Sequence, residues 1–145
     1  MIIRRASIDD LPELMRLGEL MRQESESAFP PIDPAYTRQV AELTFNLPEY
    51  AVFVADDGCL IGMITCMISG YVFSPVKIAT TDLFFVQPDR RGLKAAKMLL
   101  KAYTTWADER GIQDKRIGVS TKKDIAPLMK HFGFDPVGMN FRRLG

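Results

Sequence analysis

The chain has 145 residues, the size of one domain, and 47% of them are apolar while 26% are charged. This balance excludes a disordered or fibrous protein, and the first residues hold no apolar run long enough for a signal peptide or a membrane span. We therefore expect one domain over residues 1–145, in the cytoplasm and away from membranes. The first 60 residues carry 5 arginines and 11 carboxylates, whereas the rest carry 14 basic and 7 acidic residues, which suits an anionic ligand on one side and a cationic one on the other.

Apolar periodicity and turn residues predict the elements in chain order. A short strand is expected at 2–4, followed by two amphipathic helices at 10–23 and 33–46, the second with an apolar face of Tyr36, Val40, Leu43 and Leu47. Three strands are expected next, at 50–55, 60–72 and 77–86, and then a long helix that reaches about Arg110. The chain is expected to end with a strand at 116–120, a helix at 124–132 and a last strand at 137–144. This order indicates an α/β or α+β sheet covered by helices.

The stretch from Leu83 to Leu100 is the most informative, because a strand leads through a short turn into a helix. The unpaired N–H groups and the dipole at the start of such a helix form an anion site, and Gly92 lets the backbone approach a ligand. Positive side chains surround the turn: Arg90, Arg91, Lys94 and Lys97. The alternatives are a phosphate-bearing ligand and a basic helix start that is simply solvated. Nucleic acid is disfavoured because acidic residues are interspersed among the basic ones and no basic-aromatic motif occurs.

At this point the sequence resembles the GNAT superfamily of N-acetyltransferases. The pattern Val86-x-Pro88-x-Arg90-Arg91-Gly92, followed by a helix with Leu99-Leu100, is similar to the acyl-CoA motif of that family. Three further segments match in order and spacing: Ile3-Arg4-Arg5-Ala6 with Asp9-Asp10-Leu11, Asp56-Asp57-Gly58 with Ile61-Gly62, and His131-Phe132-Gly133-Phe134 with Val137-Gly138. The resemblance implies a mixed, mostly antiparallel sheet of six to seven strands flanked by about four helices.

The resemblance also implies acetyl-CoA as the co-substrate and no metal. The pantetheine arm would pair like an extra strand with Phe84, Phe85 and Val86. In the family the fourth and fifth strands splay apart to admit that arm, and Gly118 lies in the expected fifth strand. The pyrophosphate would rest on the turn and the start of the following helix: Arg90, Arg91, Gly92, Leu93, Lys94, Ala95, Ala96 and Lys97. Lys94 departs from the family, whose motif has glycine at this position.

The resemblance implies an acceptor amine, which must lose a proton before it attacks because an alkylammonium has a pKa near 10. Asp82 is the candidate base, with a solvated strand-edge carboxylate as the alternative. The acidic residues after the first helix, Glu24, Glu26 and Asp33, are candidates to bind the amine. Met129 stands where the family usually has a tyrosine that protonates the leaving thiolate. Ser120, Tyr103 and His131 remain candidates for that acid; the alternatives are an exposed helix-end role for His131, or no acid at all.

Three functions are compatible with these residues. The first is an enzyme that transfers acetyl from acetyl-CoA to a primary amine of a small molecule or a peptide in a ternary complex. The second is a catalytically silent GNAT-fold module that binds CoA or a protein partner. The third is a binder of another phosphate ligand or of nucleic acid. Family members pair through their sheets or last strands, so a homodimer is compatible as well.

Overall fold

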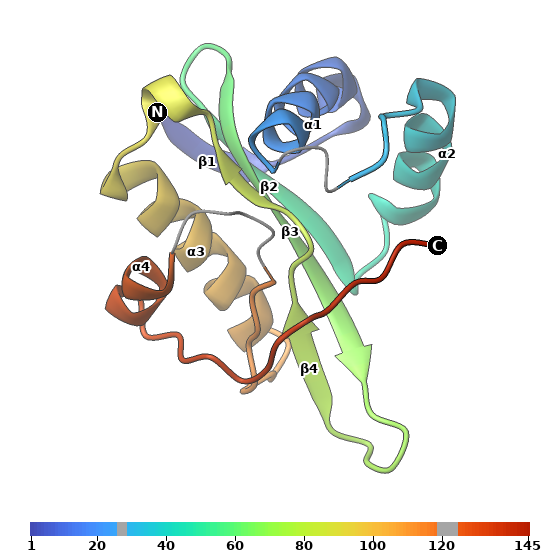
Figure 1. Cartoon of the computed structure of the whole chain (residues 1–145), viewed down its shortest axis with the longest axis vertical. Helices are drawn as coiled ribbons and strands as arrows, with labels where there is room; N and C mark the ends of the chain where they lie inside the picture. Colours follow the sequence, from blue (N-terminus) through green and yellow to red (C-terminus); the bar gives the residue numbers. More distant parts are fainter. Residues whose placement is uncertain (26–28, 119–124) are drawn as a thin grey trace.

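The structure is a computed structural model that describes residues 1–25, 29–118 and 125–145. A five-stranded sheet lies between two layers of helices (Figure 1). The strands are β1 (Ile2–Arg5), β2 (Tyr50–Asp56), β3 (Leu60–Gly70), β4 (Lys77–Thr80) and β5 (Phe84–Val86). The helices are α1 (Leu11–Glu24), α2 (Pro34–Thr44), α3 (Leu93–Asp108) and α4 (Ala126–His131), with short 3-10 turns η1 (Ile8–Asp10) and η2 (Pro88–Arg90). The predicted mixed, mostly antiparallel sheet with about four helices is therefore confirmed.

All strand pairs in the sheet are antiparallel, in the order β1-β2-β3-β4. The long strand β3 carries two partners on the edge that does not face β2: residues 62–64 pair with β5 and residues 67–70 pair with β4. The single strand predicted at 77–86 is thus broken at residues 81–83. The break has a chemical cause, because the Thr65 hydroxyl accepts hydrogen bonds from the backbone N–H groups of Asp82 and Leu83, each at 3.0 Å.

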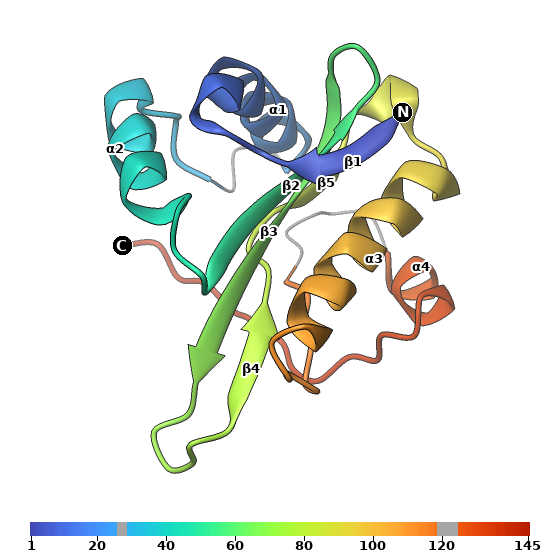
Figure 2. The same cartoon turned by 180° about the vertical axis from the view of Figure 1, so that it is seen from behind.

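Two apolar clusters lie on opposite faces of the sheet. One joins the sheet to α3 and α4 around Leu99, Tyr103 and Met129, and the other joins it to α1 around Leu17 and Met63. Figure 2 shows from behind that α1 and α2 cover one face while α3 and α4 cover the other. The strand alternation explains this division, because consecutive side chains such as Phe84 and Phe85 enter different clusters.

The prediction of six to seven strands overcounts. The strand expected at 116–120 is represented by an isolated parallel bridge between Ala79 and Lys115, extended by a hydrogen bond of 3.2 Å from Gly118 N–H to the Thr81 carbonyl. Residues 119 and 120 lie outside the described part. Residues 137–144 are not in a strand, and none of the strand pairs of the sheet includes them. Their apolar side chains are exposed instead: Val137, Met139, Phe141 and Leu144.

The predicted apolar face of the second helix is also partly wrong. Tyr36 and Leu43 are 64% and 68% exposed, whereas Ala41 is the buried residue of α2. The face that α2 turns to the rest of the molecule contains Thr37, Val40, Ala41 and Thr44, which line a pocket described below. No helix in the described ranges is long and apolar enough to cross a membrane.

Candidate functional site

The segment that follows β5 builds the turn that the sequence singled out. After η2, Gly92 forms the N-cap of α3 with an extended backbone, and no side chain caps the first N–H groups of the helix. A Cβ placed on Gly92 would meet no atom within 4 Å, so the space in front of the helix start is open. Lys94 and Lys97 are exposed on the first turn while Ala95 and Ala96 are buried against the sheet. Leu93 begins the helix.

The two arginines of the turn are held by carboxylates and by the backbone. Arg91 donates from Nε to the Val86 carbonyl at 2.9 Å, forms an ion pair with Glu24, and lies over the Phe85 ring at 5.5 Å from its centroid. Arg90 forms an ion pair with Asp57 in the β2–β3 turn. The sequence suggested Glu24 as a residue that binds the acceptor amine. In the structure its ion pair with Arg91 links the end of α1 to the turn before α3.

The backbone of β5 offers an edge for an extended ligand. Gln87 N–H donates to the Ile61 carbonyl, and Thr65 N–H donates to the Leu83 carbonyl. In this register every second pair along β3 is hydrogen-bonded, namely 61 with 87, 63 with 85 and 65 with 83. The polar backbone groups of Phe84 and Val86 must therefore point away from β3. With the open turn and the uncapped helix start, this edge fits an acyl-CoA: a strand-like arm beside β5 and phosphates at α3.

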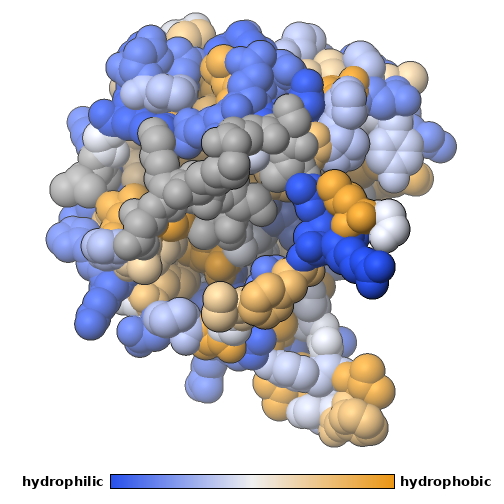
Figure 3. All heavy atoms as spheres, viewed as in Figure 1, coloured by the Kyte–Doolittle hydropathy of each residue, from blue (hydrophilic) through white to orange (hydrophobic). Residues whose placement is uncertain are grey.

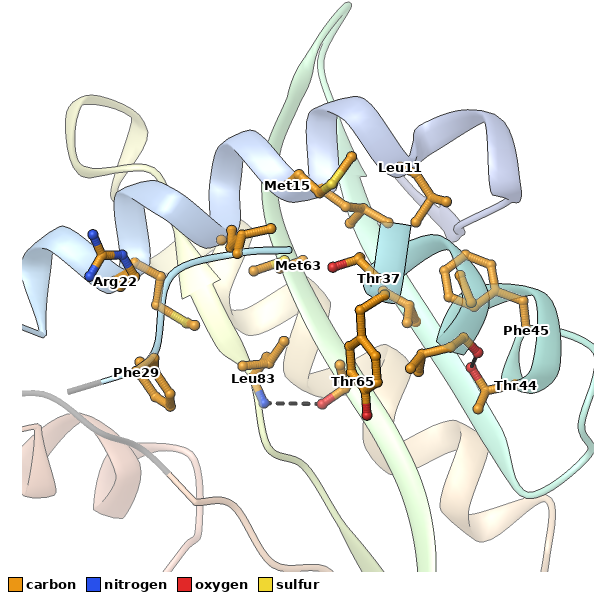
Figure 4. Close-up of a pocket in the computed structure, with 18 of the residues that line it drawn as sticks. Leu11, Met15, Arg22, Phe29, Thr37, Thr44, Phe45, Met63, Thr65 and Leu83 are labelled. Carbon is orange, nitrogen blue, oxygen red and sulfur yellow. Dashed lines mark hydrogen bonds between the residues drawn. The ribbon is translucent and has the colours of Figure 1, made fainter. Parts of the chain in front are cut away.

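A pocket of about 350 Å³ lies on the other side of the same segment, on the face of the sheet that α1 and α2 cover (Figure 4). Its walls come from α1, α2, the segment at residues 29–32 and the strands. Apolar side chains dominate the lining, among them Leu14, Met21, Val40, Met63 and Leu83. This size and composition are typical of small-molecule sites.

Thr65 and Leu83 line one part of this pocket, at the break between β4 and β5 (Figure 4). The Thr65 hydroxyl also lies 3.2 Å from the hydroxyl of Thr81, which donates to the Leu83 carbonyl at 3.0 Å. Thr65 and Thr81 are both buried. The break is therefore held by hydrogen bonds, and it carries the chain from the pocket at Leu83 to the edge strand β5 at Phe84 within one residue.

Asp82 lies in this break with an exposed side chain. It is close enough to Tyr50, another lining residue, to affect it electrostatically. Burial raises the pKa of the Tyr50 hydroxyl, and the negative charge of Asp82 raises that pKa further. Tyr50 therefore keeps its proton at neutral pH. The structure thus brings the predicted base together with a hydroxyl that the sequence analysis did not select.

Other predicted site residues lie elsewhere. His131 ends α4 with an exposed side chain, and α4 packs in the cluster on the face of the sheet opposite the pocket. Tyr103 is fully buried in that cluster and donates to the Arg116 carbonyl at 2.7 Å, so it is a core residue and not an acid. Asp33 caps α2 by accepting from Tyr36 N–H at 3.0 Å. Ser120 and Glu26 lie outside the described residues.

Tyr50 and Thr65 are the site residues that sequence reasoning missed. Both lie on strands whose pattern indicates ordinary half-buried or buried positions. A buried threonine in the apolar run of β3 was the available signal for Thr65, since a buried hydroxyl requires a partner. Within the described ranges, no group of three or more histidine, cysteine, aspartate or glutamate side chains is arranged to hold a metal ion.

Comparison with protein families gives a match to the Acetyltransferase (GNAT) family over residues 15–134. Comparison with curated proteins gives no match. Solved structures share the fold at low identity. An aminoglycoside acetyltransferase from an uncultured soil metagenomic sample, in complex with sisomicin, is 19% identical with a TM-score of 0.74, over 99% of this chain and 96% of that one.

Two further structures cover the chain as completely. A predicted acetyltransferase with acetyl-CoA from Clostridium acetobutylicum is 15% identical with a TM-score of 0.79, over 99% of this chain and 95% of that one. A ribosomal-protein-alanine N-acetyltransferase from Brucella melitensis biovar Abortus 2308 is 17% identical with a TM-score of 0.74, over 100% of both chains. At these identities the structures establish the fold, and the family match covers most of the chain. The chain belongs to the GNAT family of acetyltransferases.

Proposed function

We propose that this protein transfers an acetyl group from acetyl-CoA to a primary amine that occupies the pocket, by direct attack in a ternary complex. One observation carries the proposal: Leu83 lines the pocket, and Phe84, the next residue, begins the edge that fits the cofactor. A donor along β5 and an acceptor in the pocket would therefore meet at the break between β4 and β5. Bringing two reactants together in this way supplies much of the rate enhancement in a two-substrate transfer.

The residues of the turn would hold the cofactor. Acetyl-CoA, when bound, supplies the acetyl group as a thioester. The N–H groups at the start of α3 and the charges of Arg91 and Lys94 would bind its phosphates. The backbone groups of Phe84 and the N–H of Val86 would bind its extended arm, since the Val86 carbonyl already accepts from Arg91. Lys94, which replaces the glycine of the family motif, is exposed and places a cation at the same end of the helix.

Asp82 is our candidate for the group that removes the proton from the amine, directly or through water. Its carboxylate is exposed to solvent. Its charge raises the pKa of Tyr50, a residue of the pocket lining. Tyr50, which stays protonated, would donate a hydrogen bond into the reaction site. Ser120 stays a low-ranked proposal for the acid, and the position of His131 on α4 gives no support to a catalytic role.

The second candidate function is a silent module that binds CoA without transfer. The observation that favours it is Met129, which occupies the usual tyrosine position and is buried in the core beside α3. A thioether cannot protonate a leaving thiolate. A thiolate is a tolerable leaving group without assistance, so we rank the enzyme first.

Thiol release from acetyl-CoA distinguishes the two candidates. We expect release that depends on an added primary amine, tested with alkylamines and with a peptide that has a free N-terminus. Gly92→Trp should abolish it while the protein stays folded, because the added side chain enters open space in front of α3. Lys101→Trp is the control, since it adds the same side chain at an exposed position further along the same helix. Cofactor binding without release by any amine would support the silent module.

We also propose that the protein forms a homodimer. Large apolar side chains are exposed on the projecting end of the β3–β4 hairpin, Val72, Phe73 and Val76, and along residues 137–144 (Figure 3). Exposed apolar side chains gathered in this way are typical of interaction surfaces. The alternating apolar residues at 137, 139 and 141 suit a strand that completes a sheet with a second copy.

A further inference from the structure

The pocket carries almost no charge that could bind a polar ligand. Among its described lining residues the only charged side chain is that of Arg22, and no aspartate or glutamate takes part. Arg22 donates to Glu19 at 3.1 Å, so its own charge is paired within α1. A ligand with several ammonium groups would find no carboxylate on these walls.

The threonines of the lining already use their hydroxyl protons within the chain. Thr37 donates to the Asp33 carbonyl at 2.7 Å, and Thr44 donates to the Val40 carbonyl at 2.8 Å. Thr65 is occupied by the hydrogen bonds at the break between β4 and β5. The protons of these hydroxyls are therefore not available to a ligand in the cavity, and the Thr65 oxygen is also occupied as an acceptor.

Two of the three carboxylates that the sequence suggested for amine binding have other partners, and the third, Glu26, lies outside the described residues. Glu24 pairs with Arg91 and Asp33 caps α2. Asp82 lies at the break, directly before the lining residue Leu83, and its side chain is exposed. The described residues thus provide one negative charge at the end where transfer would occur and an apolar cavity behind it.

We infer that the acceptor is a monoamine with an apolar body, such as an alkylamine or an arylalkylamine, and not a polyamine or an aminoglycoside. This inference rests on the proposed function for the position of the reacting amine, but the class of ligand follows from the pocket walls. The cavity of about 350 Å³ has room for a body of this kind. At ~30 Å³ per water-sized group, it would hold on the order of ten such groups.

Two quantitative consequences follow from an apolar cavity. Each CH₂ group added to an alkylamine should contribute about 0.8 kcal/mol, which corresponds to about a fourfold gain in affinity until the cavity is full. A second ammonium at the far end of the alkylamine should lower the affinity at least tenfold, because a buried, unpaired charge is strongly disfavoured.

The test compares hexylamine with 1,6-diaminohexane, which has the same chain length and one more ammonium. Binding is measured by titration calorimetry without cofactor, and transfer is measured separately by thiol release with acetyl-CoA. We expect hexylamine to bind and react at least tenfold better than the diamine, and propylamine to bind more weakly than hexylamine. Equal or tighter binding of the diamine, or no binding of hexylamine, would overturn the inference. Binding of hexylamine without thiol release would instead contradict the proposed transfer and leave the ligand class supported.

Two variants of α2 locate the binding site. Val40→Asn puts an amide on the pocket wall and should weaken hexylamine binding about tenfold. Leu43→Asn is the matched control, because it makes the same kind of change on the exposed side of the same helix. Equal affinities in the two variants would place the amine outside the pocket and overturn the inference.

Discussion

Thr65 and Leu83 are joined by two hydrogen bonds: the Thr65 N–H donates to the Leu83 carbonyl at 2.9 Å, and the Leu83 N–H donates to the Thr65 hydroxyl at 3.0 Å. The same hydroxyl accepts from Asp82 N–H, so one side chain of β3 satisfies the two N–H groups at the break in the neighbouring strand. This arrangement fixes the place where the pocket meets β5, the strand that we propose for the cofactor.

Replacing the Thr65 hydroxyl should destabilise the fold at this break. Thr65→Val leaves the N–H groups of Asp82 and Leu83 without their acceptor, and we expect a loss of about 1–3 kcal/mol in the free energy of unfolding. Chemical denaturation measures this loss. Thr65→Ser keeps the oxygen and should recover most of it. No loss in Thr65→Val, with a clear loss in Thr65→Ser, would mean that the methyl group, and not the hydroxyl, is what the site requires.

Asp82→Asn tests the proposed base. The side chain is exposed, so the melting temperature should hardly change, whereas kcat should fall by about 10²-fold or more because the amine keeps its proton. Steady-state kinetics at pH 7 to 9 provide the measurement. Asp89→Asn, an exposed carboxylate in η2, serves as the control. An unchanged kcat in Asp82→Asn would assign this carboxylate to the solvated strand edge.

The sequence predicted the parts of this structure that depend on local chemistry. The turn from Val86 to Gly92 and the uncapped helix after it follow from residues that are neighbours in the chain. The break at residues 81–83 does not, because it depends on a hydroxyl that β3 brings from another part of the sequence. Likewise, Tyr50 belongs to the site only because β2, which begins at this residue, brings it to the pocket wall.

The errors have physical causes as well. The predicted face of α2 assumed that its largest apolar side chains are buried, but Leu43 is exposed and Thr37 and Thr44 face the pocket. A threonine can do so because its hydroxyl bonds to the preceding turn of the helix. The last strand was predicted from the sequence pattern and from the family resemblance, but residues 137–144 are not in a strand in the structure.

Asp10 should make stability depend on pH in the acidic range. Two hydrogen bonds of 2.8 Å from Arg4 lower the pKa of Asp10 from 3.8 to about 2. Because the folded pKa lies below the unfolded one, the stabilisation is fully present above about pH 4 and is lost as the pH falls through 2. Asp10→Asn should therefore cost about 1–2 kcal/mol at pH 7 and little at pH 2. Denaturation at both pH values tests this, and a cost that does not vary with pH would contradict it.

Phe73 tests the proposed dimer. Its side chain is 100% exposed on the hairpin, so Phe73→Asp should leave the stability of a monomer unchanged. Sedimentation velocity should give the parent protein twice the monomer mass and the variant a shift toward the monomer. Thr105→Asp, at an exposed position of α3, is the control and should keep the mass that the parent shows. A monomeric parent at all concentrations would contradict the proposal.

The most direct test of the account is the affinity for acetyl-CoA, measured by titration calorimetry. The parent should bind, and Arg91→Glu should bind at least tenfold more weakly, because it reverses a charge beside the open start of α3. Lys101→Glu makes the same charge reversal at an exposed position further along the helix. Its affinity for acetyl-CoA should stay within about twofold of that of the parent. No binding by the parent at millimolar cofactor, or equal affinities in the two folded variants, would contradict a cofactor site at this turn.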